Sequence, residues 1–347
     1  MEHRQEGSEA AALRSHIRTH GGNLESAMAL HPEAPRPWID LSTGINPVPY
    51  PVGPLPAETW TRLPSGAALA DLMAAAAFAY GAADGAMVAA APGTQALIQL
   101  LPRLMPARRV AVLGPTYGEH AAAWSAAGAA VATVTTVDAL ADADVAVVVN
   151  PNNPDGRVVA PDRLLMLSTS LARHGGRLVV DEAFADGLAG VSVVPRLDDP
   201  AARGMVVLRS FGKTYGLAGV RLGFAVADAP TAAAIRQALG PWAVPGPALT
   251  IGRAALRDGD WLAGAMARLV ADAARLDGLL AAAGLTPLGG TPLFRLAEAP
   301  EGADVWFDRL ARAGILTRPF DYAPTWLRFG LPGDAAAWGR LEAALRG

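Results

Sequence analysis

Short apolar runs alternate with longer helical patterns along the chain between residues 66 and 240. The runs are apolar at nearly every position rather than at every second one, which is typical of strands buried on both faces of a sheet. Helices between such strands join them in parallel. The sequence therefore predicts an α/β domain with a mostly parallel sheet of seven strands, at residues 86–90, 109–113, 131–134, 145–149, 177–180, 205–208 and 222–226.

The pattern changes after a proline-rich turn at residues 240–247. Long helical patterns follow, and then short strands and helices alternate up to the end of the chain. This predicts a smaller α+β domain at the C-terminus. We expect three parts: an N-terminal arm (residues 1–48) that packs with the small domain and the active site, a large domain (49–247) and the small domain (248–347).

Composition excludes several classes of function. The chain carries 29 basic and 32 acidic residues, a net charge of -3, so it has no overall basic field to hold nucleic acid or an anionic membrane. It contains no cysteine, which excludes a disulfide scaffold, a thiolate nucleophile and a Cys-ligated metal site, and we expect no metal. The amino-terminal sequence has charges of both signs and no apolar signal core, so we expect a cytoplasmic protein.

Lys213 is the one lysine among these 29 basic residues, the other 28 being arginine. Lysine and arginine substitute for each other on solvated surfaces, so a bias towards arginine can replace nearly every lysine. It cannot replace a lysine whose amine acts as a nucleophile, because guanidinium stays protonated and forms no Schiff base. The composition therefore points to Lys213 as a reactive amine.

Polar residues around Lys213 and at the ends of predicted strands indicate a ligand site. Ser210 precedes the lysine by three residues and Arg221 follows it by eight, so a turn could place a hydroxyl and a guanidinium around an anion. Asp181 directly follows the apolar run 177–180, and the sequence NPNNPDG follows the run 145–149. Open parallel sheets bind ligands at the carboxyl ends of their strands.

Four motifs together resemble the fold-type I pyridoxal-phosphate enzymes, in particular the histidinol-phosphate aminotransferase-like branch. They are Asn153-Pro-Asp-Gly, Asp181-Glu-Ala-Phe, Ser210-Phe-Gly-Lys213 and Gly219-Val-Arg221-Leu-Gly. Within that branch, His20-Gly-Gly-Asn23 and Asp40-Leu-Ser-Thr-Gly-Ile-Asn-Pro47 resemble the members that decarboxylate L-threonine O-3-phosphate in cobalamin biosynthesis. Phe184 and the pair Pro241-Trp242 agree with this subfamily.

The resemblance implies pyridoxal 5'-phosphate as cofactor and a role for each matching residue. Lys213 would form the Schiff base and move a proton, and Asp181 would pair with the pyridine nitrogen, which keeps the ring an electron sink. The remaining cofactor contacts would be the phenolate donor Asn153, the stacking Tyr117, and the phosphate-binding set Gly93, Thr94, Gln95, Ser210 and Arg221. The substrate would be bound by His20, Gly21, Arg318 and Arg328.

The function implied is a carboxy-lyase that converts L-threonine O-3-phosphate to (R)-1-amino-2-propanol O-2-phosphate and CO2. The resemblance also implies a homodimer, for which the proline-rich segment 46–56 is suited. A histidinol-phosphate or related class I or II aminotransferase is the alternative enzyme, and a catalytically silent paralogue is the alternative outside enzymes. Two departures bear on the substrate: Leu63 replaces a tyrosine common in relatives, and Gly44 replaces an asparagine.

Replacing Lys213 with arginine keeps the positive charge but removes the nucleophilic amine. We expect the K213R variant to fold and to lack the visible absorption band of a lysine-bound cofactor. Spectra of the two purified proteins with added pyridoxal 5'-phosphate, before and after borohydride reduction, measure this. An unchanged visible spectrum in the variant would show that Lys213 is not the cofactor lysine.

Overall fold

The computed structural model describes residues 20–346, which divide into two compact units. The large unit is Pro49–Ala265, and the small unit combines the described residues before Pro49 with those from Met266 onward. The division after residue 265 falls within helix α11 (Gly259–Ala282). Among the described residues, no helix has both the length and the apolar character that crossing a membrane requires.

A seven-stranded sheet forms the centre of the large unit within the described chain. The strand order is β2-β8-β7-β6-β5-β3-β4. In this sheet β8 runs antiparallel to the other six strands, which are parallel to one another. The predicted mostly parallel seven-stranded sheet is confirmed. Its strands are β2 (Val88–Ala91), β3 (Arg109–Leu113), β4 (Ala130–Val134), β5 (Val145–Val149), β6 (Arg177–Asp181), β7 (Met205–Ser210) and β8 (Gly223–Ala227).

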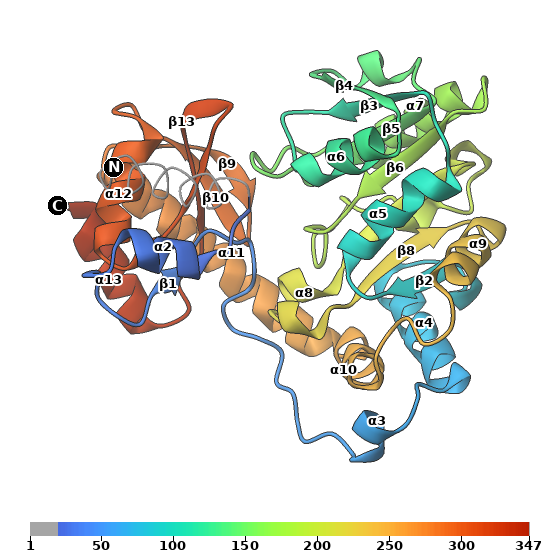
Figure 1. Ribbon diagram of the computed structural model, residues 1–347, viewed down its shortest axis with the longest axis horizontal. Coiled ribbons are helices and arrows are strands. Elements are labelled where there is room, and N and C mark those ends of the chain that lie inside the picture. Colours follow the sequence, from blue (N-terminus) through green and yellow to red (C-terminus); the bar gives the residue numbers. More distant parts are fainter. Residues whose placement is uncertain (1–19, 347) are drawn as a thin grey trace, which may run out of the picture. The chain divides into compact units, whose positions relative to one another are not determined.

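Helices cover both faces of this sheet (Figure 1). One core layer joins it to α4 (Gly66–Tyr80), α7 (Pro161–Ala172) and α10 (Gly246–Arg257), and the other to α5 (Thr94–Leu104), α6 (Gly118–Ala126) and α9 (Ala229–Leu239). The short helices α3 (Glu58–Thr61) and α8 (Phe211–Thr214) complete the unit. Because both faces are covered, all five residues of β5 are buried, as its unbroken valine-rich sequence predicts.

The small unit contains an antiparallel sheet in the order β12-β13-β10-β9. Its strands are β9 (Thr286–Thr291), β10 (Phe294–Glu298), β12 (Arg318–Phe320) and β13 (Ala323–Gly330), with helices α12 (Ala303–Arg312) and α13 (Ala335–Arg346). The N-terminal segment contributes α2 (Leu24–Leu30) and β1 (Ile39–Asp40), which pairs in parallel with β11 (Ile315–Leu316). The apolar pattern did not predict β9, because Pro287, Gly289 and Gly290 interrupt it.

Strand direction determines where the ligand edge of the large unit lies. Strands β2, β3, β5, β6 and β7 run parallel, so their carboxyl ends lie at one edge of the sheet. Strand β8 runs the opposite way and therefore begins at that same edge. The segments that follow β2, β3, β5, β6 and β7 and the segment that precedes β8 therefore all lie at this edge of the sheet.

Candidate active site

The predicted cofactor residues of the large unit all lie at this edge. Asp181 and Ser210 are the last residues of β6 and β7, and Lys213 lies in α8 directly after β7. Tyr117 and Asn153 lie in the loops that follow β3 and β5. The structure thus brings together, from four neighbouring strands, residues that are up to 96 positions apart in the sequence (Tyr117 to Lys213).

Asp181 is a buried carboxylate with two partners. Asp181 is only 3% exposed. One carboxylate oxygen accepts a hydrogen bond from the Ala183 N–H at 3.0 Å, and the other lies 2.7 Å from His120 Nε2. Burying a carboxylate is unfavourable unless hydrogen bonds and positive charge compensate it. A protonated pyridine nitrogen would supply that positive charge, so the acid is suited to the predicted role.

His120 is a site residue that the motif analysis missed. It lies in α6, only 1% exposed, three residues after Tyr117, with the two ring centroids 6.3 Å apart. A proton on Nε2 lets the imidazole donate to Asp181 and fix the orientation of that carboxylate. The available signal was a histidine in the first turn of the helix that begins directly after Tyr117.

The predicted phosphate-binding residues meet at the start of α5. Gly93 has φ +86°, and a Cβ on it would lie 2.6 Å from Nη2 of Arg221. A Cβ on Gly223 would lie 2.5 Å from the Thr94 backbone nitrogen. Arg221 itself has φ 54°, which is uncommon for a residue with a side chain. Two glycines thus allow a guanidinium and a helix N-terminus to approach closely, and this combination binds phosphate.

Lys213 is positioned by aromatic packing beneath α8. Phe211 stacks on Tyr215 with ring centroids 4.6 Å apart, and Tyr215 stacks on Trp261 at 5.5 Å. Burial raises the pKa of the Tyr215 hydroxyl, and nearby Asp186 raises it further, so this ring stays neutral. The half-buried Lys213 has its Nζ 5.6 Å from the centroid of the Phe184 ring.

The asparagines after β5 have separate tasks. The Asn150 side chain bonds to both backbone groups of Val159: it accepts from the N–H at 2.7 Å and donates to the carbonyl at 3.1 Å. Asn152 accepts from the Thr116 hydroxyl at 2.6 Å. These two amides hold the loop, which presents Asn153, 8% exposed, for the predicted contact with the cofactor.

Gln95 and Tyr117, two further predicted residues, bond to each other. The Tyr117 hydroxyl donates to Gln95 Oε1 at 3.3 Å, and Gln95 Nε2 donates to Glu119 at 2.6 Å. This chain orients the Tyr117 ring from its hydroxyl end. It also occupies the Gln95 side chain, which leaves the backbone N–H as its means of binding a phosphate at the helix N-terminus.

In the small unit, the predicted substrate residues Arg318 and Arg328 are directly opposite each other on β12 and β13. Arg328 is buried, 3% exposed, and donates to the Ser42 carbonyl at 2.6 Å. Burial, together with the adjacent positive charge of Arg318, lowers the pKa of Arg328. An anion bound between the two guanidiniums would relieve both effects, so the pair is suited to a carboxylate or phosphate.

Ser42 links this arginine pair to the other predicted substrate residues. A Cβ on Gly21 would lie 2.3 Å from the Ser42 carbonyl oxygen, the same oxygen that accepts from Arg328. The Ser42 hydroxyl accepts from the Gly22 N–H at 2.7 Å and donates to Asp40 at 2.5 Å. Gly21 and the exposed His20 beside it therefore lie next to the residue that holds Arg328.

Neither Leu63 nor Tyr50 offers a free hydroxyl group in place of the missing tyrosine. Leu63, which replaces a tyrosine of relatives, is 68% exposed. Tyr50, the preceding tyrosine in the sequence, donates to Asp258 at 3.3 Å and packs edge-on against Trp261. Burial raises the pKa of Tyr50, and Asp258 raises it further. The Tyr50 hydroxyl is thus engaged within the large unit.

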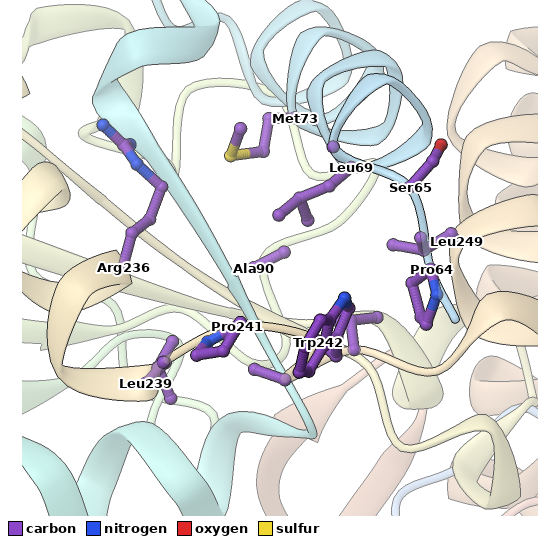
Figure 2. A pocket seen from close by; sticks show the side chains of 14 residues that line it. Pro64, Ser65, Leu69, Met73, Ala90, Arg236, Leu239, Pro241, Trp242 and Leu249 are labelled. Atoms are coloured by element: carbon purple, nitrogen blue, oxygen red, sulfur yellow. The ribbon is translucent and has the colours of Figure 1, made fainter.

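A cavity of about 200 Å³ in the large unit is lined by none of the predicted cofactor-binding or substrate-binding residues. Figure 2 shows its largely apolar lining, in which Trp242 lies beside Pro64 and Leu249. Trp242 has φ 57° and remains 58% exposed. This surface is distinct from the predicted cofactor site.

Comparison with known proteins agrees with the geometry. The sequence profile of aminotransferase class I and II matches residues 57–341. The chain belongs to this family. It is 49% identical over 328 residues to the threonine-phosphate decarboxylase of a Sinorhizobium species, and 45% identical over 331 residues to that of Pseudomonas aeruginosa; each match covers 94% of this chain and 97% of the relative.

Solved structures show the same fold. The histidinol-phosphate aminotransferase from Sinorhizobium meliloti, in complex with pyridoxal-5'-phosphate, has a TM-score of 0.80 at 22% identity over 93% of each chain. That from Clostridium acetobutylicum has a TM-score of 0.77 at 18% identity, over 89% of this chain and 98% of that one. The predicted fold-type I class is confirmed.

The Gly93 position provides a test of the phosphate site. In a G93A variant the Cβ would displace the Arg221 guanidinium, so we expect the affinity for pyridoxal 5'-phosphate to fall about tenfold or more. Gly128 is a matched control, because it has φ +90° and nothing within 4 Å of a Cβ. Fluorescence titration of the two apoproteins measures the dissociation constants. Equal losses in G93A and G128A would assign the effect to backbone strain.

Proposed function

We propose that this chain is a pyridoxal-phosphate-dependent decarboxylase of L-threonine O-3-phosphate, which forms (R)-1-amino-2-propanol O-2-phosphate and CO2 for cobalamin biosynthesis. The observation that carries the proposal is the near-full-length similarity to two threonine-phosphate decarboxylases, at 49% and 45% identity. Matches to histidinol-phosphate and aromatic amino acid aminotransferases cover about half of the chain. The geometry of both units supports the same choice.

The large unit has the residues to hold the cofactor. Gly93, Thr94, Ser210 and Arg221 would bind its phosphate, and Lys213 would bind its aldehyde carbon through Nζ. When bound, pyridoxal 5'-phosphate supplies an electron sink for a bond broken at the substrate's Cα. Asp181, held by His120 and the Ala183 N–H, would keep the proton on the ring nitrogen, and Asn153 would donate to the phenolate oxygen.

Lys213 has a second task once the substrate amine has replaced it. Its Nζ would then be released as an ammonium, carrying the proton that the substrate's own ammonium brought in, and would be in position to donate that proton to Cα after CO2 leaves. That step balances decarboxylation, since the electron pair left by the carboxylate is taken up with one proton. Arginine at this position could not serve, because it stays protonated.

The small unit has the residues to bind the substrate's anions. A phosphate dianion needs several donors, and Arg318, Arg328, the Gly21 N–H and His20 form a set connected through Ser42. We propose that this set takes the phosphate. The bond that breaks is the one perpendicular to the cofactor ring, so holding the phosphate leaves the carboxylate able to turn out of the ring plane. An arginine that held the carboxylate in plane would favour loss of the Cα proton and transamination.

One experiment separates these reactions. The protein loaded with pyridoxal 5'-phosphate is incubated with phosphothreonine and, separately, with phosphoserine, and CO2 is measured. The same protein is then given 2-oxoglutarate with histidinol phosphate or an aromatic amino acid, and glutamate is measured. We expect CO2 from phosphothreonine and no glutamate. Glutamate without CO2 would establish the aminotransferase alternative, and neither product, with no cofactor bound, would establish a silent paralogue.

The arginine pair gives a sharper prediction about the phosphate. Loss of one charged hydrogen-bond partner costs about 1.5–3 kcal/mol, or roughly ten- to a hundredfold in binding. We expect R318A and H20A each to weaken phosphothreonine binding by that much and to leave binding of unphosphorylated threonine nearly unchanged. Titration calorimetry measures both ligands, with R312A, an exposed arginine of α12, as control. Equal losses for both ligands would mean that the residues hold the carboxylate.

We also propose a cytoplasmic homodimer that binds neither nucleic acid nor membranes. Trp60, Leu63 and Trp242 are large apolar side chains that the monomer leaves exposed, at 67%, 68% and 58%. A second copy would cover such a surface favourably. Light scattering at concentrations where the protein is active should give the mass of a dimer, and a monomer there would contradict the proposal.

A further inference from the structure

A buried ion cluster lies beside the cofactor site without belonging to it. Arg209, 3% exposed, bonds to Glu182 at 2.8 Å and makes a short contact with Asp186. Glu182 is fully buried and also accepts from the Ser192 hydroxyl at 2.6 Å and the Val193 N–H at 2.7 Å. The guanidinium carbon lies 4.3 Å from the centroid of the Tyr80 ring.

Sequence position ties this cluster to the site. Glu182 directly follows Asp181, and Arg209 directly precedes Ser210. Because side chains alternate along a strand, Arg209 and Ser210 of β7 point to opposite faces of the sheet. Glu182, directly after β6, bonds to Arg209 and to Val193 and so lies on the Arg209 face. The core layers agree: Asp181 bonds to His120 of α6 on one face, whereas Arg209 packs on Tyr80 of α4 on the other.

Backbone bonds connect the same residues. The Glu182 N–H donates to the Leu208 carbonyl at 2.8 Å, which pairs the ends of β6 and β7. The Arg209 carbonyl accepts from the Thr94 hydroxyl at 3.2 Å, which joins the start of α5 to β7. The cluster therefore lies behind three parts of the site: the ring-nitrogen acid, the lysine helix and the phosphate-binding helix N-terminus.

Stability alone does not account for this cluster. Burial works against the charge of Arg209, yet Asp186 and Glu182 outweigh it and raise the pKa of the guanidinium. Burial raises the pKa of Glu182, an effect that Arg209 and Ser192 oppose. Apolar side chains of similar size are commonly as stabilising as a buried ion pair. Arg209 follows the apolar residues Val206, Val207 and Leu208 in its strand, so a continued apolar run would have filled the space.

We propose that Arg209, Glu182 and Asp186 are positioning residues for the cofactor site. The guanidinium bonds to the residue after β6 and to the turn beyond it, and so fixes the ends of β6 and β7 relative to each other. That arrangement sets the position of the Asp181 carboxylate towards the ring nitrogen and of Ser210 and Lys213 around the cofactor. The inference rests on the proposed cofactor site and not on the choice of substrate.

The test compares R209M with a variant that is destabilised far from the site. Leu171 of α7 is fully buried, and its carbonyl accepts from the Gly176 N–H directly before the amino end of β6. L171A should lower the unfolding temperature without removing a bond at the carboxyl ends of β6 and β7, where the ion cluster lies. We expect R209M to bind pyridoxal 5'-phosphate about tenfold more weakly and to shift the pH midpoint of the bound cofactor's visible band by about half a unit. L171A should leave both quantities unchanged. Equal effects in the two variants, or no effect in R209M, would overturn the proposal.

Two further variants keep the test decisive. The triple variant R209M/E182Q/D186N carries no charge in this cluster, so we expect it to regain thermal stability but not cofactor affinity. Full recovery of affinity would assign the R209M defect to the unpaired carboxylates and overturn the positioning role. If R209M does not fold, R209K gives the same measurements, because an ammonium keeps the charge but lacks the planar fork that spans both carboxylates. Failure of the unaltered protein to bind the cofactor would instead contradict the proposed function.

Discussion

The carboxylate of Asp181 is buried at the end of a strand, and the surrounding structure is organised to hold that charge. His120 and the Ala183 N–H bond to its two oxygens, and its own carbonyl accepts from the Asn150 N–H at 2.8 Å. These contacts require α6 to lie over β6 and require β5 to end beside it. The loop that carries Asn153 and the helix that follows Tyr117 are therefore placed by the same residue that would pair with the cofactor ring.

Side-chain alternation separates the two kinds of polar residue at this edge. Asp181 and Ser210 face the layer that contains α5 and α6, whereas Glu182 and Arg209 face the layer that contains α4 and α7. The polar residues that would contact the cofactor thus lie on the opposite face of the sheet from the charged residues that bond only to the protein. In a sheet covered on both faces, each polar residue must find its partners within its own layer.

In the proposed function the two units have different tasks. The large unit would hold the cofactor with a lysine, an acid and a phosphate-binding helix N-terminus. The small unit would hold the substrate's anions with paired arginines, of which Arg328 is buried beside Ser42. In this proposal, the second task would set which bond lies perpendicular to the ring, and so would select decarboxylation over transamination.

The sequence by itself determined the mostly parallel seven-stranded sheet and singled out the candidate site residues. Strands buried on both faces leave an unbroken apolar pattern, and a single lysine stands out among 28 arginines. Only the tertiary structure decided the partners of those residues. His120 meets Asp181 across 61 positions, and Arg328 meets Ser42 across 286. Arg209 and Glu182 are ordinary charged residues in the sequence, and nothing local marks them as buried. The physical reason is that an ion pair or hydrogen bond depends on which strands become neighbours, and local patterns predict the strands but not their order.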